Sequence, residues 1–313
     1  VVFMFPGQGS QYYQMGRELF MNNATFKNEL LKLDSIAYSI LGDSVVSTIY
    51  DVTKRKSEDF NDTKYTHPAI FMTGYSLAKA FMEDGIYPHY LLGASLGELC
   101  AAAIAGLIDV KDALYVIIKQ AKIFIECCKH GGMIAILGNP VLFDNVSEIN
   151  KNSELAAINY NSHFVVSGSI EGILQVEDYL RNKNIPFQNI SVEFGFHSSH
   201  INPAEARYKE LFKHIIINNP NIPIVSCVKG DFLSRAECEY FWQVVRNRIN
   251  FPEAITKLEG IAENCVYIDV SFSGTLANFV KYNLDRKSKS EVFAPITQFG
   301  CNTKIINCLK SLI

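Results

Sequence analysis

The stretch Tyr90-Leu91-Leu92-Gly93-Ala94-Ser95-Leu96-Gly97-Glu98 decides the fold class of this chain. Its first four residues form a short, mainly apolar run typical of a buried strand, and the residues from Leu96 to Ala105 predict a helix directly behind it. Between them, Ser95 is flanked by glycines in the pattern Gly-x-Ser-x-Gly, which marks a sharp strand-to-helix turn that exposes a serine hydroxyl. We therefore expect the hydroxyl of Ser95 to be available as a nucleophile.

The turn needs both of its glycines, because side chains two residues before and two residues after the serine would collide with neighbouring backbone. The helix that follows directs its N-terminal amides at the site, where they would stabilise negative charge on an attacked carbonyl. The pattern alone is weak evidence, since three fixed residues in five recur by chance. The alternative is a glycine-flanked turn in an ordinary parallel sheet.

Strands and helices alternate around this turn. Val1-Val2-Phe3-Met4-Phe5 has no charged leader before it, so it predicts a buried parallel strand and not a signal peptide. Helical spacing runs from Tyr12 to Phe20, and Thr66-His67-Pro68 predicts the start of another helix with Thr66 as its cap. A further helix is expected over Val110 to Cys127. This alternation predicts an α/β fold with a parallel sheet and helices on both faces.

The pattern changes from about Gly131. Short strands are predicted there around a helix over Gly172 to Asn182, and they cover Met133–Leu137, Leu155–Ile158, Phe164–Ser167 and Pro186–Val192. Several short strands around few helices favour a small α+β subdomain, of which the ferredoxin-like fold is one form. Longer elements then return, with helices over Pro203–His214, Cys238–Val245 and Thr275–Tyr282 and a buried strand over Val266–Val270.

Composition limits the classes of function. Hydrophobic residues make up 48% and charged residues 19%, as in globular proteins. The net charge is -3 and no segment concentrates Lys and Arg, which disfavours nucleic acid as a partner. Eight scattered cysteines without metal-ligand spacing predict reduced thiols, no metal site and a cytoplasmic location. The longest apolar stretch, Leu99 to Ile108, has about half the length that spans a bilayer, so no membrane span is expected.

A second glycine-rich turn, Pro6-Gly7-Gln8-Gly9-Ser10-Gln11, follows the first strand. Its glycines let the backbone approach a ligand closely, so the amide of Gln8 is a candidate second oxyanion donor. A phosphate loop is disfavoured, because the Lys-Ser/Thr tail of such loops is missing.

A serine nucleophile needs a base, and the chain has seven histidines. His197 stands out in Phe194-Gly195-Phe196-His197-Ser198-Ser199-His200, because a loop that follows a strand can present a ring to the sheet edge where Ser95 lies. Spacing alone does not separate His197 from His200, and each could be a plain surface or core histidine. The order Ser then His also fits ordinary α/β-hydrolases, with an Asp between the two.

Five motifs, in order and spacing, resemble the malonyl-CoA:acyl-carrier-protein transacylases and the acyltransferase components of polyketide synthases over nearly the whole chain. They are Phe5-Pro6-Gly7-Gln8-Gly9-Ser10-Gln11, Thr66-His67-Pro68-Ala69, Gly93-Ala94-Ser95-Leu96-Gly97-Glu98, Asn159-Tyr160-Asn161-Ser162 and Phe196-His197-Ser198-Ser199. The resemblance implies a large α/β-hydrolase-like domain over 1–127 and 194–313. It also implies an inserted ferredoxin-like subdomain over 128–193.

The resemblance also implies roles for single residues. It makes Ser95 the nucleophile and selects His197, and not His200, as the general base. The oxyanion donors would be the backbone amides of Gln8 and Leu96.

In this family a backbone carbonyl, instead of a carboxylate, braces the histidine. The matching segment lies near Val244 to Asn247, where Val244 stands in place of the family's amide side chain. Asn161, in the fourth motif, is expected in the substrate pocket.

Three departures from the family pattern concern the acyl group. Malonyl-specific members carry an Arg twenty-five residues after the nucleophile that pairs with the substrate's free carboxylate, and the same count from Ser95 reaches Gln120. A desolvated carboxylate that loses this partner is destabilised by about 3–5 kcal/mol. Helix rotation is expected to point the nearby Lys119 and Lys122 away from the site. The alternative is that Lys122 or another cation bends into the site and replaces the Arg. The other two departures are Ala94, where a His is usual, and His67, where a Gln is usual. They predict a less polar pocket and a rim that titrates near neutral pH, although His67 could equally be an inert helix-start residue.

These departures favour an acyl hydrolase that clears acyl groups without a carboxylate from acyl carrier protein, as one branch of the resembled family in polyketide biosynthesis does. The partners would be the acyl carrier proteins of a polyketide synthase, with acyl-CoA as another acyl donor. No bound cofactor is expected, since the substrates are themselves phosphopantetheine or CoA thioesters. The alternatives are a malonyl or other acyl transacylase and a non-catalytic component that only docks carrier protein. A generic esterase or patatin-like lipase shares the serine turn, but it would not account for the Gln8 turn together with the His197 segment.

Overall fold

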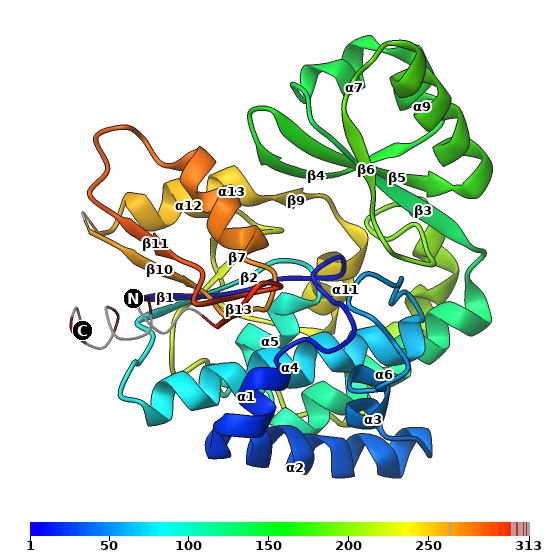
Figure 1. Cartoon of the computed structure of the whole chain (residues 1–313). Coiled ribbons are helices and arrows are strands. Elements are labelled where there is room, and N and C mark those ends of the chain that lie inside the picture. Colours follow the sequence, from blue (N-terminus) through cyan, green and yellow to red (C-terminus); the bar gives the residue numbers. More distant parts are fainter. Residues whose placement is uncertain (263, 302–304, 306–308, 310, 312–313) are drawn as a thin grey trace.

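The structure is a computed structural model that describes residues 1–262, 264–301, 305, 309 and 311. A six-stranded sheet forms its centre, in the order β11-β10-β1-β2-β7-β8 (Figure 1). The strands of this sheet are β1 (Val2–Phe5), β2 (Tyr90–Gly93), β7 (Ile224–Ser226), β8 (Asp231–Phe232), β10 (Val266–Asp269) and β11 (Glu291–Phe293). All neighbours run parallel except β7 and β8, which are antiparallel. The predicted α/β fold with a parallel sheet is confirmed.

The two central strands, β1 and β2, place the two glycine-rich turns side by side. All four residues of β1 are buried, as the apolar run at the start of the chain predicts for a strand covered on both faces. Phe5 pairs with Gly93, so both strands end at the same edge of the sheet. The Pro6 turn and the serine turn therefore leave the sheet next to one another.

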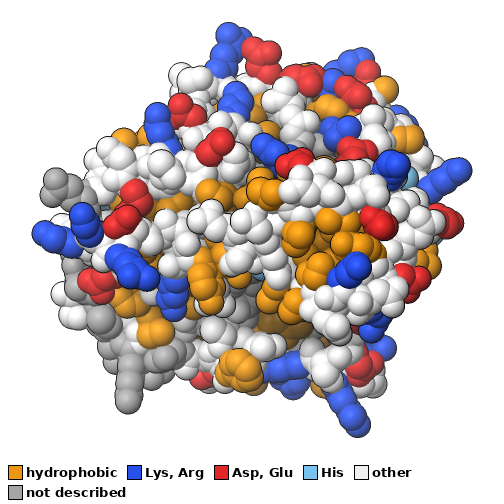
Figure 2. All heavy atoms as spheres, turned by 90° about the horizontal axis from the view of Figure 1, so that it is seen from above, with side chains coloured by type: hydrophobic (Ala, Val, Ile, Leu, Met, Phe, Trp, Pro, Cys, Tyr) orange, Lys and Arg blue, Asp and Glu red, His pale blue; other side chains and the backbone are white. Residues whose placement is uncertain are grey.

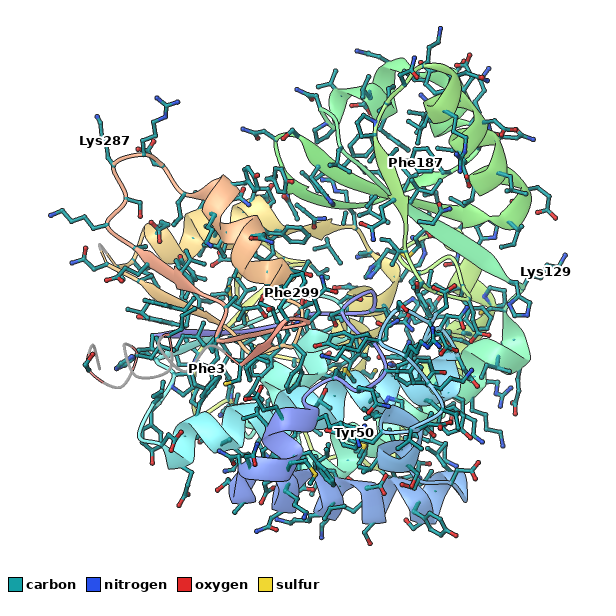
Figure 3. The ribbon with its side chains drawn as sticks, viewed as in Figure 1. Phe3, Tyr50, Lys129, Phe187, Lys287 and Phe299 are labelled. Atoms are coloured by element: carbon teal, nitrogen blue, oxygen red, sulfur yellow. The ribbon has the colours of Figure 1, made fainter. Side chains whose placement is uncertain are left out.

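Helices cover both faces of the large sheet. Helices α2, α4, α5 and α6 lie on one side, and α12 and α13 lie on the other (Figure 1). The helices of this part are α1 (Arg17–Asn22), α2 (Ala24–Leu41), α3 (Val45–Ile49), α4 (Thr63–Glu83), α5 (Gly97–Ile104), α6 (Val110–Cys127), α10 (Glu205–Glu210), α11 (Cys238–Arg246), α12 (Phe251–Glu259) and α13 (Thr275–Asn283). The side chain of Phe3 lies inside this layered core, whereas Lys129 and Lys287 point outward (Figure 3). A short hairpin of β12 (Ile296–Thr297) and β13 (Gly300–Cys301) follows β11.

A second, five-stranded sheet has the order β6-β3-β5-β4-β9 and its own small core around Phe164 and Val166. Its elements are β3 (Gly131–Ile136), α7 (Val141–Asn145), α8 (Ser147–Asn150), β4 (Glu154–Tyr160), β5 (His163–Ser169), α9 (Ile170–Asn182), β6 (Phe187–Asn189) and β9 (Ile249–Asn250). The first four strands alternate with helices in the β-α-β-β-α-β order of a ferredoxin-like unit. The fifth strand, β9, comes from outside residues 128–193 and pairs parallel to β4. The exact limits of the two domains, 1–127 with 194–313 and 128–193, stay a prediction.

Three predicted helices differ from the observed ones. Helix α1 begins only at Arg17 and not at Tyr12, because Gln14 and Gly16 adopt φ angles of 68° and 70°, which no α-helix tolerates. Helix α4 begins at Thr63, where the Asp62 side chain accepts from the Lys64 amide, so Thr66 is not its cap.

The segment predicted as one helix over Pro203–His214 is broken. A 3-10 turn over Ser199–Ala204 precedes α10, and another over Leu211–His214 follows it. Pro203 has no N–H, so it cannot donate the bond that would join the first turn to a continuous α-helix.

Among the helices within the described residues, none has the length and apolar character that a membrane crossing requires. The seven cysteines that the structure describes are free thiols, and Cys308 lies outside the described residues.

We predict that Gly97→Ala destabilises the protein by about 3 kcal/mol or more, because the new methyl would lie 1.9 Å from the carbonyl oxygen of Phe5, which is fixed in the sheet. The matched control is Gly74→Ala in the interior of α4, where the nearest atom to a new methyl is 3.6 Å away. There the gain in helix propensity should leave stability unchanged or raised by about 0.5–1 kcal/mol. Urea unfolding of both variants measures the difference, and equal stabilities would contradict this account of the turn.

Candidate active site

Ser95 occupies the tight turn between β2 and α5 with a φ of 54°, which is unusual for a residue other than glycine. A side chain at Gly93 would lie 2.4 Å from the Cα of Glu98. The amides of Gly97 and Glu98 donate to the carbonyls of Ala94 and Ser95 and close the turn. The strained backbone thus lifts the Ser95 hydroxyl out of the sheet edge, as the Gly-x-Ser-x-Gly pattern predicts.

The turn after β1 passes directly over the serine. A methyl on Gly7 would lie 2.7 Å from the Cβ of Ser95, so only glycine allows this approach. The turn is held by its own side chains, because the Ser10 hydroxyl donates to the Gly7 carbonyl at 2.8 Å and the Gly9 amide donates to Gln11 at 2.7 Å. Gln8 is therefore fixed beside Ser95.

His197 lies next to the serine, with 2.8 Å between its Nε2 and the Ser95 Oγ. On its other side, Nδ1 lies 2.8 Å from the backbone carbonyl oxygen of Asn247. A carbonyl only accepts, so Nδ1 carries the proton and Nε2 is left to accept from the serine hydroxyl. His197 also has a positive φ, 59°, and its amide donates to the Val245 carbonyl at 3.0 Å.

These contacts bear on two expectations about the histidine. His197, and not His200, faces Ser95, while the main-chain amide of His200 donates to the hydroxyl of Ser198. A backbone carbonyl holds the ring, and it belongs to Asn247, the last residue of the expected segment Val244 to Asn247. The expectation that Val244 stands at the bracing position is wrong, because Val244 lies one turn earlier on α11 with its side chain buried in the core.

Burial lowers the pKa of His197 to about 4, although the hydrogen bond to the Asn247 carbonyl acts in the opposite direction. The imidazole is therefore neutral at physiological pH and able to accept a proton.

Gln8 and Leu96 line the same small space as Ser95. Leu96 stands at the N-cap of α5, so its amide is one of the helix's free N-terminal donors. Within the described part of the chain, neither amide donates to a backbone carbonyl. This arrangement can hold negative charge on an oxygen that is bonded to the Ser95 side chain.

A cleft of about 590 Å³ opens above Ser95 and His197, between the two sheets. Figure 2 shows hydrophobic side chains gathered on this upper face of the molecule. The lining comes from both domains and includes Gly7, Gln8, Ala94, Met133, Asn159, Tyr160, His163, Phe196, Phe279 and Tyr282. At one wall the rings of Tyr160 and Tyr282 stack 4.4 Å apart.

Ala94 lines this cleft as expected, whereas the placement of Asn161 in the pocket is wrong. Asn161 is exposed in the turn between β4 and β5, and Asn159 lines the cleft in its place. Strand β4 ends at Tyr160, and its register against β5 is irregular between Ile158 and Tyr160, so strict alternation does not decide which of these residues faces the cleft. The motif Asn159-Tyr160-Asn161-Ser162 contains Asn159, but nothing in the sequence singles it out from Asn161.

Behind Ser95 a second space, of about 10 Å³, leaves room for one water molecule at most. Gln8, His67, Leu96, Gln120, Phe124, Phe196 and Val245 line it together with Ser95. Gln120 is fully buried, and its Nε2 lies 3.2 Å from Nδ1 of His67. The structure thus places Gln120 next to Ser95, at the position expected from the sequence.

The expectation that His67 titrates near neutral pH at the pocket rim is wrong. His67 lies on α4 with its side chain buried in the protein interior, and this burial lowers its pKa to about 3. Lys122 points to solvent and pairs with Glu126, and the Lys119 ammonium lies over the ring of Tyr115. The residues that line the small space therefore carry no cation at neutral pH.

One contributor to the site was not expected from the sequence. The ring of Phe124, 5.2 Å from the ring of Phe196, has no local sequence signature, whereas Phe196 lies in the motif that also contains His197. Within the described ranges, no group of three His, Cys, Asp or Glu side chains is placed to hold a metal ion.

Comparison with known proteins gives one consistent family. Residues 2–304 match the model of the acyl transferase domain. The chain is 44% identical over 299 residues to the polyketide biosynthesis acyltransferase homolog BaeD of Bacillus velezensis, covering 96% of this chain and 92% of that protein. It is 44% identical over 310 residues to the polyketide biosynthesis acyltransferase homolog PksD of Bacillus subtilis, covering 99% and 95%. A loading acyltransferase from the avermectin modular polyketide synthase has the same fold, with a TM-score of 0.87 at 23% identity and 99% of each chain covered.

We predict that the rate at which a fluorophosphonate labels Ser95 stays constant from about pH 5.5 to pH 8 and falls only as pH drops through about 4–5, where His197 gains a proton and can no longer accept one. Stopped labelling reactions, read by intact-protein mass, measure this profile. A midpoint near the ordinary imidazole value of about 6.5 would show that His197 is not held as described.

Proposed function

The chain belongs to the acyl transferase domain family, and on that premise we propose that it is a serine enzyme of polyketide biosynthesis that hydrolyses short acyl groups from acyl carrier protein. The observation that carries the serine mechanism is the 2.8 Å contact between the Ser95 hydroxyl and the neutral ring of His197. The assignment to polyketide biosynthesis is supported by the two relatives of that description, which are 44% identical over nearly the whole chain. The substrates would be thioesters of phosphopantetheine on the carrier protein, or of CoA, and no further cofactor enters the scheme.

In the first half-reaction, Nε2 of His197 takes the proton of Ser95 while Oγ attacks the thioester carbonyl. The carbonyl oxygen becomes negative, and the amides of Gln8 and Leu96 hold it. When the carbon–sulfur bond breaks, the proton passes from His197 to the departing thiolate. The products are a free thiol and an acyl ester of Ser95.

In the second half-reaction the same imidazole activates the group that removes the acyl chain. Water donates a proton to Nε2 of His197, and its oxygen attacks the ester carbonyl. Collapse returns the proton to Ser95 and releases a carboxylic acid. The Asn247 carbonyl keeps Nδ1 protonated through both half-reactions, so the ring always offers Nε2 to the substrate side.

The acyl group is proposed to be short and to lack a second carboxylate. The space behind Ser95 is about 10 Å³ and is lined by aromatic rings, the neutral His67 and the amide of Gln120. A malonyl carboxylate would fit beside Gln120 only if these side chains moved apart, and it would then be desolvated without a cationic partner, at a cost of about 3–5 kcal/mol. An acetyl or similar group carries no such penalty.

The alternative is a transacylase that passes the acyl group from CoA to carrier protein through the same ester of Ser95. The names of the two 44% identical relatives, which call them acyltransferase homologs, favour this candidate. The two activities share every residue of the first half-reaction, and they differ in whether water or a second thiol takes the acyl group. A non-catalytic docking component would not need the buried contact between Ser95 and His197.

We predict that the enzyme removes acetyl from acetyl-loaded carrier protein at least about tenfold faster than malonyl from the malonyl-loaded form, since only malonyl needs an ion pair. Mass spectrometry of the carrier protein over time measures both rates, and Ser95→Ala is the control that should abolish both. Acetyl-carrier protein that persists over many turnovers would contradict hydrolysis. Transfer of acetyl to a second, unloaded carrier protein would instead support the transacylase.

A second prediction concerns Gln120. Gln120→Arg should raise the rate of malonyl labelling of Ser95 by about tenfold or more, because the guanidinium supplies the missing bidentate partner. Gln120→Leu, which is of similar size and uncharged, is the matched control and should leave malonyl labelling low. If both variants label with malonyl like the original protein, Gln120 does not set the acyl preference.

A further inference from the structure

A buried carboxyl group outside the proposed mechanism lies one turn behind the nucleophile. Glu98 is on the first turn of α5, and its side chain is 1% exposed. Its amide donates to the carbonyl of Ser95 at 2.9 Å, so the residue is tied directly to the backbone of the strained turn. Burial raises the pKa of Glu98 to about 7, and an ionisable group in such a place usually has a specific partner.

The partners of this carboxyl come from two other elements. One oxygen accepts hydrogen bonds from the hydroxyl of Tyr240 on α11. The other accepts from the hydroxyl of Ser226 at the end of β7, at 3.2 Å, and from the amide of Val228 at 3.4 Å. Glu98 therefore joins the helix of the nucleophile to α11 in the core.

The opposite end of α11 holds the base. Val245, in its last turn, accepts from the main-chain amide of His197 at 3.0 Å. Asn247, its C-cap, accepts from the His197 ring at 2.8 Å. Tyr240 and Asn247 are seven residues apart. About two turns of α11 therefore separate the Tyr240–Glu98 hydrogen bond from the Asn247–His197 hydrogen bond.

We infer that Glu98 is a positioning residue, which together with Tyr240 fixes α11 so that the Asn247 carbonyl holds His197 at reacting distance from Ser95. The contacts form a closed ring from Ser95 through α5, Glu98, Tyr240 and α11 to Asn247, His197 and back to Ser95. If one contact in this closed series is lost, the distance between the Ser95 hydroxyl and the His197 ring is free to vary. This inference rests on the proposed serine mechanism and assigns Glu98 no contact with substrate.

The chain offers a matched control at the other end of the sheet. Glu259 accepts from the hydroxyl of Tyr267 at 2.7 Å and from the hydroxyls of Ser288 and Ser290. Tyr267 pairs with Val2 at the start of β1, whereas the site lies beyond Phe5 at the end of that strand. The two clusters have the same chemistry, and only the Glu98 cluster is linked to the base.

The test compares Tyr240→Phe with Tyr267→Phe. We expect Tyr240→Phe to lower the rate of fluorophosphonate labelling of Ser95 and the kcat for an acyl thioester by roughly tenfold or more, with KM unchanged. Tyr267→Phe should change both rates less than about twofold. Thermal unfolding of the two variants shows whether any difference simply follows stability.

If Tyr240→Phe does not fold, the double variant Glu98→Leu/Tyr240→Phe removes both partners of the Glu98–Tyr240 hydrogen bond at once, while the Ser226 oxygen still accepts from the amides of Val228 and Lys229. It should show the same loss of labelling. Glu98→Gln keeps an oxygen that accepts from Tyr240, while its amide can donate to Ser226, so it should restore most of the rate.

The inference would be overturned, and the serine mechanism left intact, if Tyr240→Phe and Glu98→Leu/Tyr240→Phe labelled Ser95 at the same rate as the original protein. Equal losses in the Tyr240 and Tyr267 variants would also overturn it, because they would indicate a general effect of stability. If the original protein itself does not label at Ser95, the proposed function fails, and the positioning role fails with it.

Discussion

The contact between the Ser95 hydroxyl and the His197 ring joins segments 102 residues apart, and both residues sit at backbone angles that L-amino acids rarely adopt. Each such position costs about 1–3 kcal/mol and persists only where its surroundings over-determine it. At Ser95 the surroundings are the backbones of Phe5 and Glu98, which leave no room for a side chain at Gly97 or Gly93. At His197 they are two carbonyls from the end of α11. Packing of the large sheet and its helices thus holds the two reacting groups together.

A feature could be predicted from the sequence to the extent that it depends on residues close together in the chain. The serine turn is encoded within five residues, so its position and strained φ follow from the sequence alone. The choice between His197 and His200 depends on which ring reaches Ser95 across the fold, and spacing does not contain that information. The brace is a backbone carbonyl, which any residue carries, so the sequence could place it in the segment Val244 to Asn247 but could not single out Asn247. The predictions that failed for α1 and α4 concerned helix starts, where Gln14 and Asp62 outweigh the spacing of apolar residues.

The charges of the pocket residues show the same limit of prediction from sequence. His67 was expected to titrate near neutral pH because of its residue type, but burial in α4 lowers its pKa to about 3. It therefore acts as an uncharged neighbour of Gln120, and the residues that line the small space beside Ser95 include no cation. At Gln120 the absence of charge follows from residue type alone, because an amide side chain is neutral in any environment. Wherever charge depends on burial, as at His67 and Glu98, the three-dimensional structure is needed.

The central claim is that an acyl ester forms on Ser95, and the most direct measurement is peptide mapping of the protein after brief reaction with an acetyl thioester and acid quenching. The account predicts an acetyl group on the peptide that contains Ser95, and none after Ser95→Ala. It also predicts that replacing His197 slows the appearance of this ester, because the same ring takes the proton of Ser95 in the first half-reaction. An acetyl group on another residue, or equal modification of the Ser95→Ala protein, would contradict the account.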